Sequence, residues 1–392
     1  MATKQGVRRA NLAAVLRLVH REGPLSRAAL TQATGLNRST VGDLVAALAD
    51  AGLVVEHEPD ALRKVGRPSP VVAAVPEIVA IAANPEVDAL TIAAVGLDRG
   101  IRARVRLERD TLLTPEETAQ LIGEQLAQWR RGPLRRSRPV AVGVAVPGPV
   151  RASDGFVRAA PHLKWTGAAL APMVTQATRL PAVIGNDANM GAVAEHLFGA
   201  AHRQDDVVYL NGGASGIGGG IILGGRLVTG VGGYTGEFGQ NRPAVACEDD
   251  RRSPDGVLED EVSRARLLEA VGLRGVDDAQ LAAALAAGAS GGAAEGGAGA
   301  SAAAEVARQR RILATALANA VNALNPSVVV LGGFLAILAA ADVPGLLADV
   351  QAQTMDATSE HLEIRPATLA DDRLLIGAAE AAFAALLHDP LG

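Results

Sequence analysis

The sequence is poor in cysteine and in aromatic residues. It has one cysteine, Cys247, among 392 residues, so no disulfide can form within the chain, and a reducing compartment is expected. Aromatic residues make up 2%, so the core must be built from alanine, valine, leucine and isoleucine. No run is long and apolar enough for a membrane span, and Arg17 interrupts the one apolar stretch that resembles a signal peptide. We therefore expect a cytoplasmic protein with no membrane partner.

Charge is distributed unevenly along the chain. Residues 1–75 contain ten Lys and Arg against six Asp and Glu, a net charge of +4, although the whole chain carries −5. A basic segment joined to an acidic remainder indicates that only the first segment meets a polyanion. The length of 392 residues allows two or three domains.

The first 75 residues predict three helices followed by a hairpin. Apolar residues recur at helical spacing over 11–21, and Ser26 is placed to cap a second short helix. After a glycine turn, Asn37 would cap a third helix, Arg38–Ala51. Two β-branched runs further on can pair as a hairpin. This order is the pattern of a winged helix-turn-helix.

Polar and basic residues stand where such a module meets DNA. The third helix begins Asn-Arg-Ser-Thr, and side chains at that position of the motif enter the major groove. The basic hairpin tip would lie on phosphates or in the minor groove. A protein-binding trio of helices is the alternative, but the local positive charge favours DNA. The residues assigned to DNA are Asn37, Arg38, Ser39, Thr40, Arg63, Lys64 and Arg67.

Residues 76–392 alternate apolar strands with helices, which predicts an α/β domain. A short apolar run leads into Asn186 and Asp187, which begin a helix through His196. Polar groups between a strand and a helix lie where α/β sheets bind ligands. The stretch 282–304, almost all Ala, Gly and Ser, indicates helix ends joined by a loop.

A glycine-rich hairpin is expected between Leu210 and Gln240. Gly216 and Gly218–Gly220 lie between two β-branched runs, and without a Cβ atom the backbone there can approach a neighbour closely. Taken alone, this pattern fits an ordinary glycine-rich hairpin as well as a ligand-binding turn.

In order and spacing, these motifs resemble those of the ROK family (repressor, open reading frame, kinase) over essentially the whole chain. The matching segments are 142–149, 186–189, 216–225, 236–239 and 325–333. The resemblance implies an α/β fold with an N-terminal winged helix-turn-helix, residues 1–75, and a two-lobed actin-like ATPase (ribonuclease H-like) domain, residues 76–392. It places lobe 1 at about 76–185 plus the C-terminal helix 374–387, and lobe 2 at about 186–370. It also implies a sugar ligand between the lobes, and homodimers or homotetramers.

One departure from the family pattern concerns ATP. The family's kinases carry an Asp-x-Gly-Gly-Thr loop around the phosphates, and residues 84–88 take its place here. Glu86 and Val87 replace the glycine pair, and Asp88 replaces the threonine. Two carboxylates repel phosphates, and the added Cβ atoms keep the backbone at a distance. We therefore expect no ATP-dependent phosphotransfer, no catalytic residue and no cofactor.

A second departure concerns zinc, which the family's kinases and many of its repressors hold through one His and three Cys. The matching positions are Gln240, Asp250, Arg252 and Val257, none of which can form a thiolate or imidazole bond to zinc. Cys247 lies outside the pattern. The sequence therefore predicts that no metal is bound.

The resemblance leaves a set of sugar-binding positions. Carboxylates and amides suit a sugar because each can bond two neighbouring hydroxyls. Asp187 matches the base of the family's kinases, but without ATP it would only bind. His162 and Trp165 fall where a family loop approaches the sugar, although Trp165 fits a core position equally well. The residues assigned to the sugar are Asn186, Asp187, Glu237, Gln240 and Glu259.

Three functions compete at this point. The first is a transcriptional repressor whose affinity for a double-stranded DNA operator changes when a sugar or sugar derivative binds. The second is a sugar kinase that also regulates, against which the 84–88 loop argues. The third is a repressor without an effector, whose body serves only as a dimerisation platform.

Overall fold

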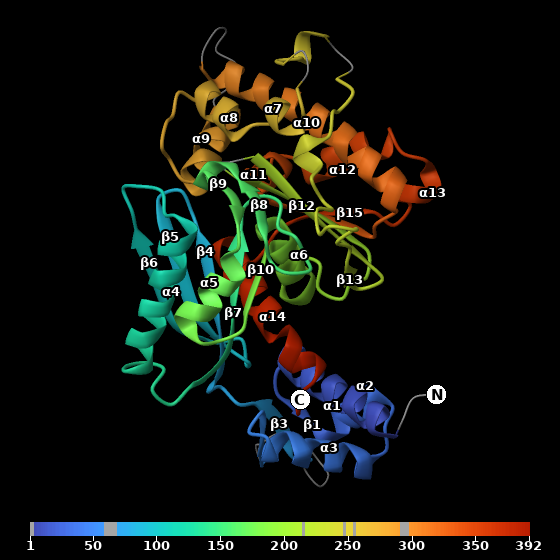
Figure 1. The fold of residues 1–392 in the computed structure, drawn as a ribbon. Helices are drawn as coiled ribbons and strands as arrows, with labels where there is room; N and C mark the ends of the chain where they lie inside the picture. Colours follow the sequence, from blue (N-terminus) through green and yellow to red (C-terminus); the bar gives the residue numbers. More distant parts are fainter. Residues whose placement is uncertain (1–3, 59–68, 214–215, 246–247, 254–255, 291–297) are drawn as a thin grey trace. The chain divides into compact units, whose positions relative to one another are not determined.

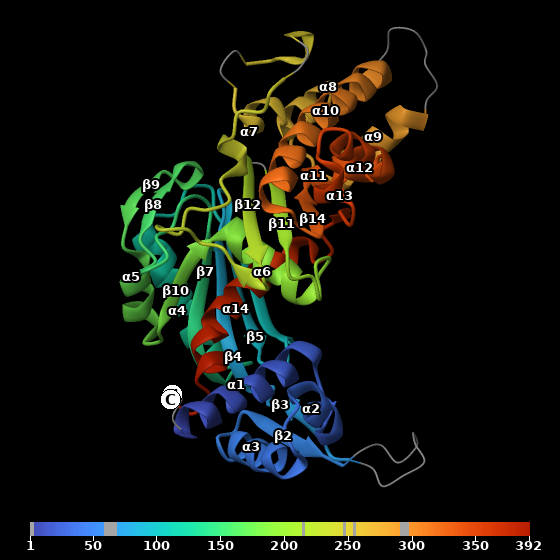
Figure 2. The same ribbon diagram turned by 90° about the vertical axis from the view of Figure 1, so that its right-hand side faces the viewer.

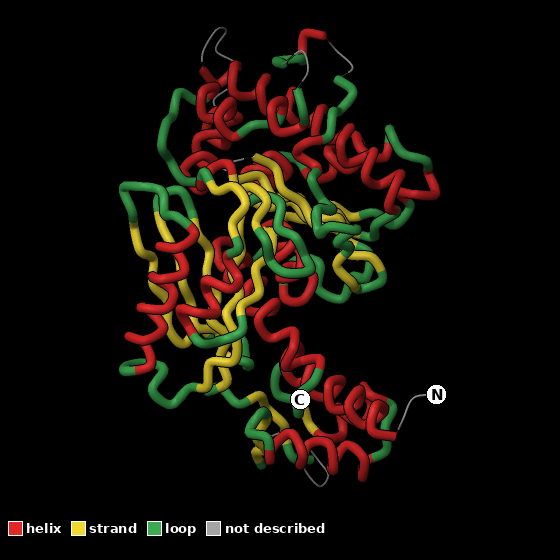
Figure 3. The backbone as a smooth tube through the Cα atoms, viewed as in Figure 1, coloured by secondary structure: helices red, strands yellow, loops and turns green. Residues whose placement is uncertain are grey.

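The computed structural model describes residues 4–58, 69–213, 216–245, 248–253, 256–290 and 298–392. The chain divides into two compact units (Figure 1). The first unit consists of Met1–Val146, Val150–Gly185 and Leu375–Gly392, and the second of Pro147–Pro149 and Asn186–Leu374. Each unit contains a mixed β-sheet with helices packed on it (Figure 3).

The N-terminal part of the first unit contains helices α1 (Lys4–Glu22), α2 (Arg27–Thr34) and α3 (Arg38–Asp50). Strands β1 (Leu25–Ser26), β2 (Val54–His57) and β3 (Val71–Ala74) form an antiparallel sheet in the order β1-β3-β2. The predicted caps are confirmed, because the side chains of Ser26 and Asn37 accept hydrogen bonds from the backbone N–H groups of Ala29 and Thr40. Helix α1 begins seven residues before the predicted start, in a stretch of good helix formers that lacks apolar periodicity.

The main sheet of the first unit has the order β6-β5-β4-β7-β10. Its strands are β4 (Ile78–Pro85), β5 (Ala89–Gly96), β6 (Ile101–Glu108), β7 (Arg138–Val146) and β10 (Ala182–Asn186). Helices α4 (Pro115–Arg130) and α5 (Leu170–Thr178) share a hydrophobic cluster with Val142, Val144 and Val146 of β7. Position 143 faces the opposite side of the sheet from Val142 and Val144, because successive residues of a strand face alternate sides. A Cβ atom there would collide with the backbone of Ala378, so α14 (Arg373–His388) packs on the opposite face (Figure 2).

The main sheet of the second unit repeats this connectivity in the order β13-β12-β11-β14-β15. Its strands are β11 (Val207–Gly213), β12 (Gly216–Leu223), β13 (Arg226–Leu227), β14 (Val328–Gly333) and β15 (Glu363–Pro366). In both sheets the first three strands in sequence form an antiparallel meander, and the fourth pairs in parallel with the first. The repeated connectivity indicates two lobes of the same architecture.

Alternating residues of the second sheet enter two hydrophobic clusters. Val208 and Leu210 of β11 pack toward α10 (Ala298–Leu324) and α11 (Phe334–Ala340). Val207 and Tyr209 pack toward α6 (Asp187–Phe198). The sequence predicts a helix from Arg308 to Leu324, but α10 starts ten residues earlier, at Ala298, because the alanine-rich stretch before Arg308 is a good helix former. The sheet is thus buried on both faces, as its continuous apolar strands predict.

Shorter elements complete the described parts of both units. They are β8 (Val157–Ala160), η1 (Pro161–Leu163), β9 (Trp165–Ala168), η2 (Phe238–Gln240), η3 (Glu248–Asp250), α7 (Leu258–Glu261), α8 (Arg264–Ala270), α9 (Asp278–Ser290), α12 (Val343–Gln351), α13 (Asp356–Ser359) and η4 (Ala370–Asp372). Over the described ranges, no single helix has the length and apolar character to cross a membrane; α11 and α12, bent at 92°, meet that test only as a pair.

Helix α1 is fastened to α14 within the first unit. His20, 1% exposed, places Nδ1 2.5 Å from the carbonyl oxygen of Leu97 and Nε2 2.8 Å from Oε1 of Glu380. Both partners are acceptors when Glu380 is ionised, so both ring nitrogens must then donate and His20 is an imidazolium. Nearer the start of α1, Arg9 Nη2 lies 2.7 Å from Asp389 Oδ2. The N-terminal helices are therefore tied directly to the C-terminal helix.

We predict that the stabilisation provided by His20 disappears in alkaline solution. Burial lowers the pKa of His20 and Arg99 opposes its charge, but the hydrogen bond and charge of Glu380 outweigh them, so the pKa is raised. The contribution is therefore complete below pH 6.5 and lost as the pH rises through the higher folded value. At pH 6 we expect His20→Gln to lower the free energy of unfolding by about 1.5–3 kcal/mol. The difference in melting temperature between wild type and variant should shrink towards pH 9, and a difference independent of pH would contradict the ion pair.

Candidate functional site

Asn186 and Asp187 lie at the junction between β10 and α6. Asn186 caps the helix, because its Oδ1 accepts from the backbone N–H of Asn189 at 2.9 Å. Its Nδ2 donates to the carbonyl of Gly148 at 3.1 Å and to Oδ1 of Asp187 at 3.2 Å. The same oxygen of Asp187 accepts from the N–H of Ala188 at 2.7 Å. The cap therefore fixes the carboxylate at the positive end of α6.

The glycines of β12 bring the hairpin against this helix. A Cβ atom on Gly218 would lie 2.7 Å from the Cβ of Ala188, and one on Gly220 would lie 2.5 Å from the Cβ of Ala192. A Cβ atom on Gly219 would collide with the Phe238 ring. These glycines therefore allow close packing against α6 and against the ring of Phe238. The sequence alone did not show whether the hairpin approaches a ligand or the protein itself.

Glu237, Gln240 and Glu259 lie on the other side of the hairpin. Gln240 Nε2 donates to Glu259 Oε1 at 2.6 Å, and Glu259 Oε2 accepts from the N–H of Ile217 at 3.1 Å. Glu237 directly precedes the short helix that contains Gln240. The turn before it requires glycine at position 236, because φ is +101° there and an added Cβ atom would collide with the carbonyl of Gly219. The five predicted sugar-binding residues all belong to the second unit.

Carboxylates influence one another across this site. Burial raises the pKa of Asp187 to about 6, and the charge of Glu237 adds to the shift. The N–H of Ala188 and the charge of Arg373 act in the opposite direction. Burial also raises the pKa of Glu237, and the charge of Glu259 contributes. The three acids thus form an electrostatically coupled series with Arg373 as a counter-charge.

Arg373 is a member of the site that sequence reasoning missed. It begins α14, and its guanidinium acts on the carboxylate of Asp187 and on the hydroxyl of Tyr209. The arginine lies 186 residues from Asp187 in sequence and in no motif of its own, so no local pattern identifies it. His162 and Trp165 belong to the first unit. Trp165 is 4% exposed and its Nε1 donates to the carbonyl of Leu113 at 2.7 Å, so it is a core residue.

The side chains of the site are suited to hydrogen bonding with hydroxyl groups. Carboxylate oxygens accept, amide groups of Asn186 and Gln240 both donate and accept, and paired contacts of this kind suit vicinal hydroxyls. Asp187, with a pKa of about 6, is also suited to accept a proton near neutral pH. Both properties follow from burying acids beside one another.

We predict that Asp187→Asn stabilises the protein at neutral pH while it weakens any ligand contact. Since the folded pKa of Asp187, about 6, lies above the ordinary 3.8, ionisation disfavours the folded state. Stability therefore falls as the pH rises from about 4 to 6. The neutral amide avoids a cost of up to about 3 kcal/mol. Thermal unfolding of both proteins at pH 4 and pH 7 measures this, and a variant less stable than wild type at pH 7 would contradict it.

The turn between β4 and β5 contains the residues that the sequence resemblance matched to the kinase phosphate loop. The N–H of Glu86 donates to the carbonyl of Ala89 at 2.8 Å, closing a tight turn. The carboxylates of Glu86 and Asp88 are paired with Arg106, the latter at 2.9 Å. The sequence showed two carboxylates without a partner. In the structure both pair with Arg106 of β6, whose single positive charge offsets one of their two negative charges. The backbone N–H of Glu86 and the side chains of both acids thus already have partners within the protein.

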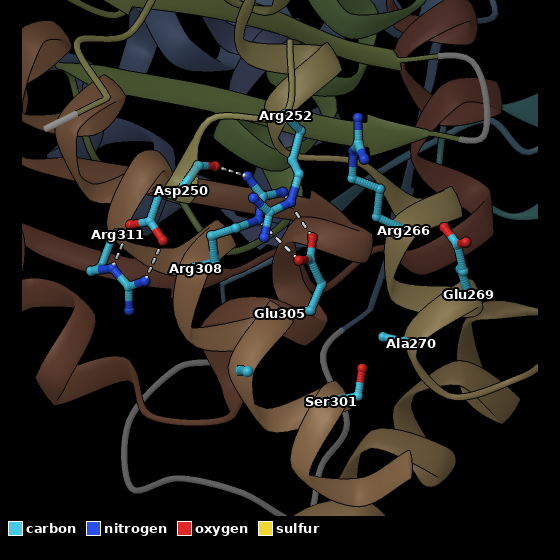
Figure 4. A pocket seen from close by; sticks show the side chains of 10 residues that line it. Asp250, Arg252, Arg266, Glu269, Ala270, Ser301, Glu305, Arg308 and Arg311 are labelled. Carbon is cyan, nitrogen blue, oxygen red and sulfur yellow. Dashed lines mark hydrogen bonds and ion pairs between the residues drawn. The ribbon is translucent and has the colours of Figure 1, made fainter. Parts of the chain in front are cut away.

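An ion-pair cluster includes Asp250 and Arg252, two of the four positions that match the family's zinc ligands. Glu261, 1% exposed, accepts from Nη1 of Arg308 at 3.0 Å and from the N–H groups of Arg252 and Ser253 at 3.1 and 2.9 Å. Arg308 also donates to the carbonyl of Asp250 at 2.8 Å. Asp250, Arg252 and Arg308 also line a pocket of about 460 Å³, which Figure 4 shows.

The four zinc positions themselves are not arranged as a ligand set. Gln240 is bonded to Glu259, Asp250 to Arg311, and the N–H of Val257 to Asp260. Within the ranges that the structure describes, no group of three or more His, Cys, Asp or Glu could hold a metal ion. Cys247 lies outside the described residues.

The N-terminal module exposes the first turn of α3. Asn37, Arg38 and Ser39 are exposed and Thr40 is half-buried. Asn37 Oδ1 accepts from the N–H of Thr40 at 2.8 Å and from the hydroxyl of Ser39 at 2.7 Å. A bidentate contact to adenine needs that oxygen, so Asn37 acts first as a cap. Arg63, Lys64 and Arg67 of the predicted hairpin tip lie outside the described residues.

Comparison with known proteins identifies a matching family model and several similar proteins. The family model described as "ROK family" matches residues 87–384. A xylose repressor of Caldicellulosiruptor bescii is 25% identical over 383 residues, which are 90% of this chain and 90% of the repressor. A glucokinase of Halalkalibacterium halodurans is 28% identical over 268 residues, 62% of this chain and 76% of the kinase.

A solved structure extends the likeness over the entire fold. It is a ROK family transcriptional regulator described as a homologue of the E. coli MLC protein. The TM-score is 0.77 at 22% identity, and the match covers 98% of each chain. At this identity the likeness establishes the α/β architecture, while function depends on the residues of the sites.

Proposed function

The chain belongs to the ROK family, and from this we propose that it is a DNA-binding transcriptional regulator, of repressor type, that senses a sugar or sugar derivative without phosphorylating it. The observation that carries the proposal is the coupled set of Asp187, Glu237 and Glu259 with the amides of Asn186 and Gln240. A regulator of this kind would act as a homodimer or homotetramer, because paired modules read paired half-sites.

The N-terminal module supports the DNA-binding part. Its helices and antiparallel strands have the order of a winged helix-turn-helix, with α3 as the recognition helix. Arg38 at the exposed start of α3 suits a guanine edge. Arg38→Ala should cost about 1–3 kcal/mol of discrimination at one base pair and leave binding to random duplex nearly unchanged. The relative from Caldicellulosiruptor bescii, of which 90% is matched, is named a xylose repressor.

The sensing part is tested by thermal unfolding with D-xylose, D-glucose and N-acetyl-D-glucosamine added singly. A ligand at 100 times its dissociation constant adds about 2.7 kcal/mol to the free energy of unfolding, which is easily seen as a raised melting temperature. Asp187→Asn and Glu259→Gln should abolish the rise. A panel of sugars that never changes the melting temperature would favour a repressor without an effector, whose body only dimerises.

A sugar kinase with a DNA-binding module is the second candidate. The pKa of Asp187 near 6 favours it, since a base of that strength can take a proton from a hydroxyl. The β4–β5 turn argues against it, because the Glu86 N–H and both acids are already paired. We expect no sugar-dependent release of ADP from ATP above that of Asp187→Asn. Release that depends on both the sugar and Asp187 would establish the kinase.

A further inference from the structure

A cluster of arginines lies at the end of α4 and in the turn that leads to β7. Between Glu124 and Asp154 the chain contains no acidic residue. This interval carries five arginines within nine positions: Arg130, Arg131, Arg135, Arg136 and Arg138. We call this group the arginine turn. All five are exposed. It is therefore a concentrated positive surface in a chain whose overall net charge is −5.

The arginine turn has a defined backbone, although its charges have no partners among the described residues. Leu134, 1% exposed, anchors it in the core, and its N–H donates to the carbonyl of Trp129 at 2.9 Å. The N–H of Arg135 donates to the carbonyl of Gly132 at 3.2 Å. Among the residues that the structure describes, none of the five guanidinium groups forms an ion pair or a hydrogen bond. The turn thus presents its charges to solvent from a fixed frame.

Structural roles account for only part of this cluster. Arg130 and Arg131 stand at the C-terminus of α4, where a positive charge stabilises a helix. The remaining three extend no helix, and concentrating like charge without counter-charges costs free energy. Glu77 lies beside Arg138, but the hydrogen bond between the two residues uses the backbone carbonyl of Glu77. An external polyanion is the partner that such an arrangement fits.

The turn lies beside the segment that joins the N-terminal module to the rest of the first unit. The N–H of Arg138 donates to the carbonyl of Glu77 at 2.7 Å, and Arg138 pairs with Ile78 in the sheet. Two residues earlier, the N–H of Val75 donates to the carbonyl of Leu53 in the module at 3.0 Å. Two residues span about 7 Å at most. Glu77, which is bonded to Arg138 at the end of the arginine turn, therefore lies at most about 7 Å from Val75, which is bonded to the module that carries α3.

We propose that the arginine turn is a second DNA contact, which binds backbone phosphates of the duplex beside the stretch occupied by the N-terminal module. Arginine suits this role because its planar guanidinium can hold a phosphate in a bidentate manner. The contact carries no base readout, so it adds affinity and fixes the orientation of the body on DNA. The proposal rests on the DNA-binding function proposed above, and it adds a surface that the helix-turn-helix pattern does not include.

The test measures the salt dependence of binding of the full chain to a 40-base-pair duplex of random sequence. Each phosphate contact adds about 0.9 to the slope of log affinity against log salt concentration. If three arginines contribute, Arg131→Gln, Arg135→Gln and Arg136→Gln together should lower the slope by about 2.7 per chain. The affinity lost between 50 and 200 mM salt would then be about 40-fold smaller than for wild type. The lysine versions of the same three changes should keep most of the slope, because the charge remains.

Each outcome decides between the two proposals. If the Gln variant keeps the wild-type slope while changes in the N-terminal module reduce it, the arginine turn is not a DNA contact and the DNA-binding function stands. If the Gln variant loses slope while changes at α3 alter no base preference, the turn is a polyanion surface and the proposed module fails. If the wild type binds no duplex at 50 mM salt, both proposals fail. Thermal unfolding checks that the variants are folded, since exposed unpaired arginines change stability by only about 0.5 kcal/mol.

Discussion

Arg308→Met is expected to lower the free energy of unfolding by about 3–5 kcal/mol, because it leaves a buried carboxylate without its counter-charge. Arg308 is 2% exposed and Glu261 is 1% exposed. The guanidinium also donates to Glu305 at 2.8 Å and to the carbonyl of Asp250 at 2.8 Å. Its removal therefore releases α7, α10 and the 250–253 segment together. Differential scanning calorimetry should show the loss as a lower melting temperature.

Arg311 offers a matched control, three residues along the same helix. It binds Asp250 through two hydrogen bonds of 2.7 and 3.0 Å, but its side chain is 56% exposed. Exposed pairs contribute at most about 1 kcal/mol, so Arg311→Met should change stability little. In a double-mutant cycle, Arg308→Met and Glu261→Gln should cost clearly less together than the sum of their separate effects. Equal losses for Arg308→Met and Arg311→Met would show that burial of the pair does not matter.

Affinity for operator DNA is expected to fall about 10³–10⁵-fold between 50 and 200 mM salt, the range for six to ten phosphate contacts. Replacing Arg63, Lys64 and Arg67 with glutamine should remove about 0.9 of slope for each contact, or roughly six contacts in a dimer. The loss should be nearly the same for all sequences, because phosphates carry no base information. Fluorescence anisotropy against salt measures it with the operator and with random duplex.

A variant of the second unit separates this effect from net charge. Arg203, Arg226 and Arg274 are exposed and far in sequence from the N-terminal module. Replacing all three with glutamine removes the same charge, yet the slope should stay within one contact of wild type. A fall as large as that of the hairpin variant would mean that overall charge, not the hairpin, determines affinity.

The sequence predicted most elements because local rules and burial agree in them. Strands such as β7 and β14 are continuous apolar runs, and the Asn37 and Ser26 caps fix helix starts through side-chain chemistry. The errors occur where composition permits a helix without demanding it, at the start of α1 and of α10. Strand β1 has two residues and exists only through its pairing with β3, so no local pattern could reveal it.

The candidate sites show the same difference between residues that local patterns identify and residues that depend on distant partners. Contiguous motifs around Asp187 and Glu237 could be found in sequence, and the structure connects them electrostatically. Arg373, His20 and Glu380 could not be found, because each depends on a partner more than 180 residues away. The two acids of the β4–β5 turn were found, but not the arginine that pairs with both of them, since Arg106 lies on a different strand. Long-range pairing is the information that spacing alone lacks.

Ion pairs and hydrogen bonds of Arg308, Glu261 and Glu305 hold the 250–253 segment, and their contribution to stability depends on pH. Burial raises the pKa of Glu305, but hydrogen bonds from Arg308 and Gln309 outweigh it, so the pKa is lowered. The contribution of Glu305 is therefore complete above its ordinary pKa and disappears as the pH falls through the folded value. The contribution of these ion pairs to stability is therefore lost in acid. Peroxide and chelators should not affect it, because arginine and glutamate side chains contain no sulfur and need no metal.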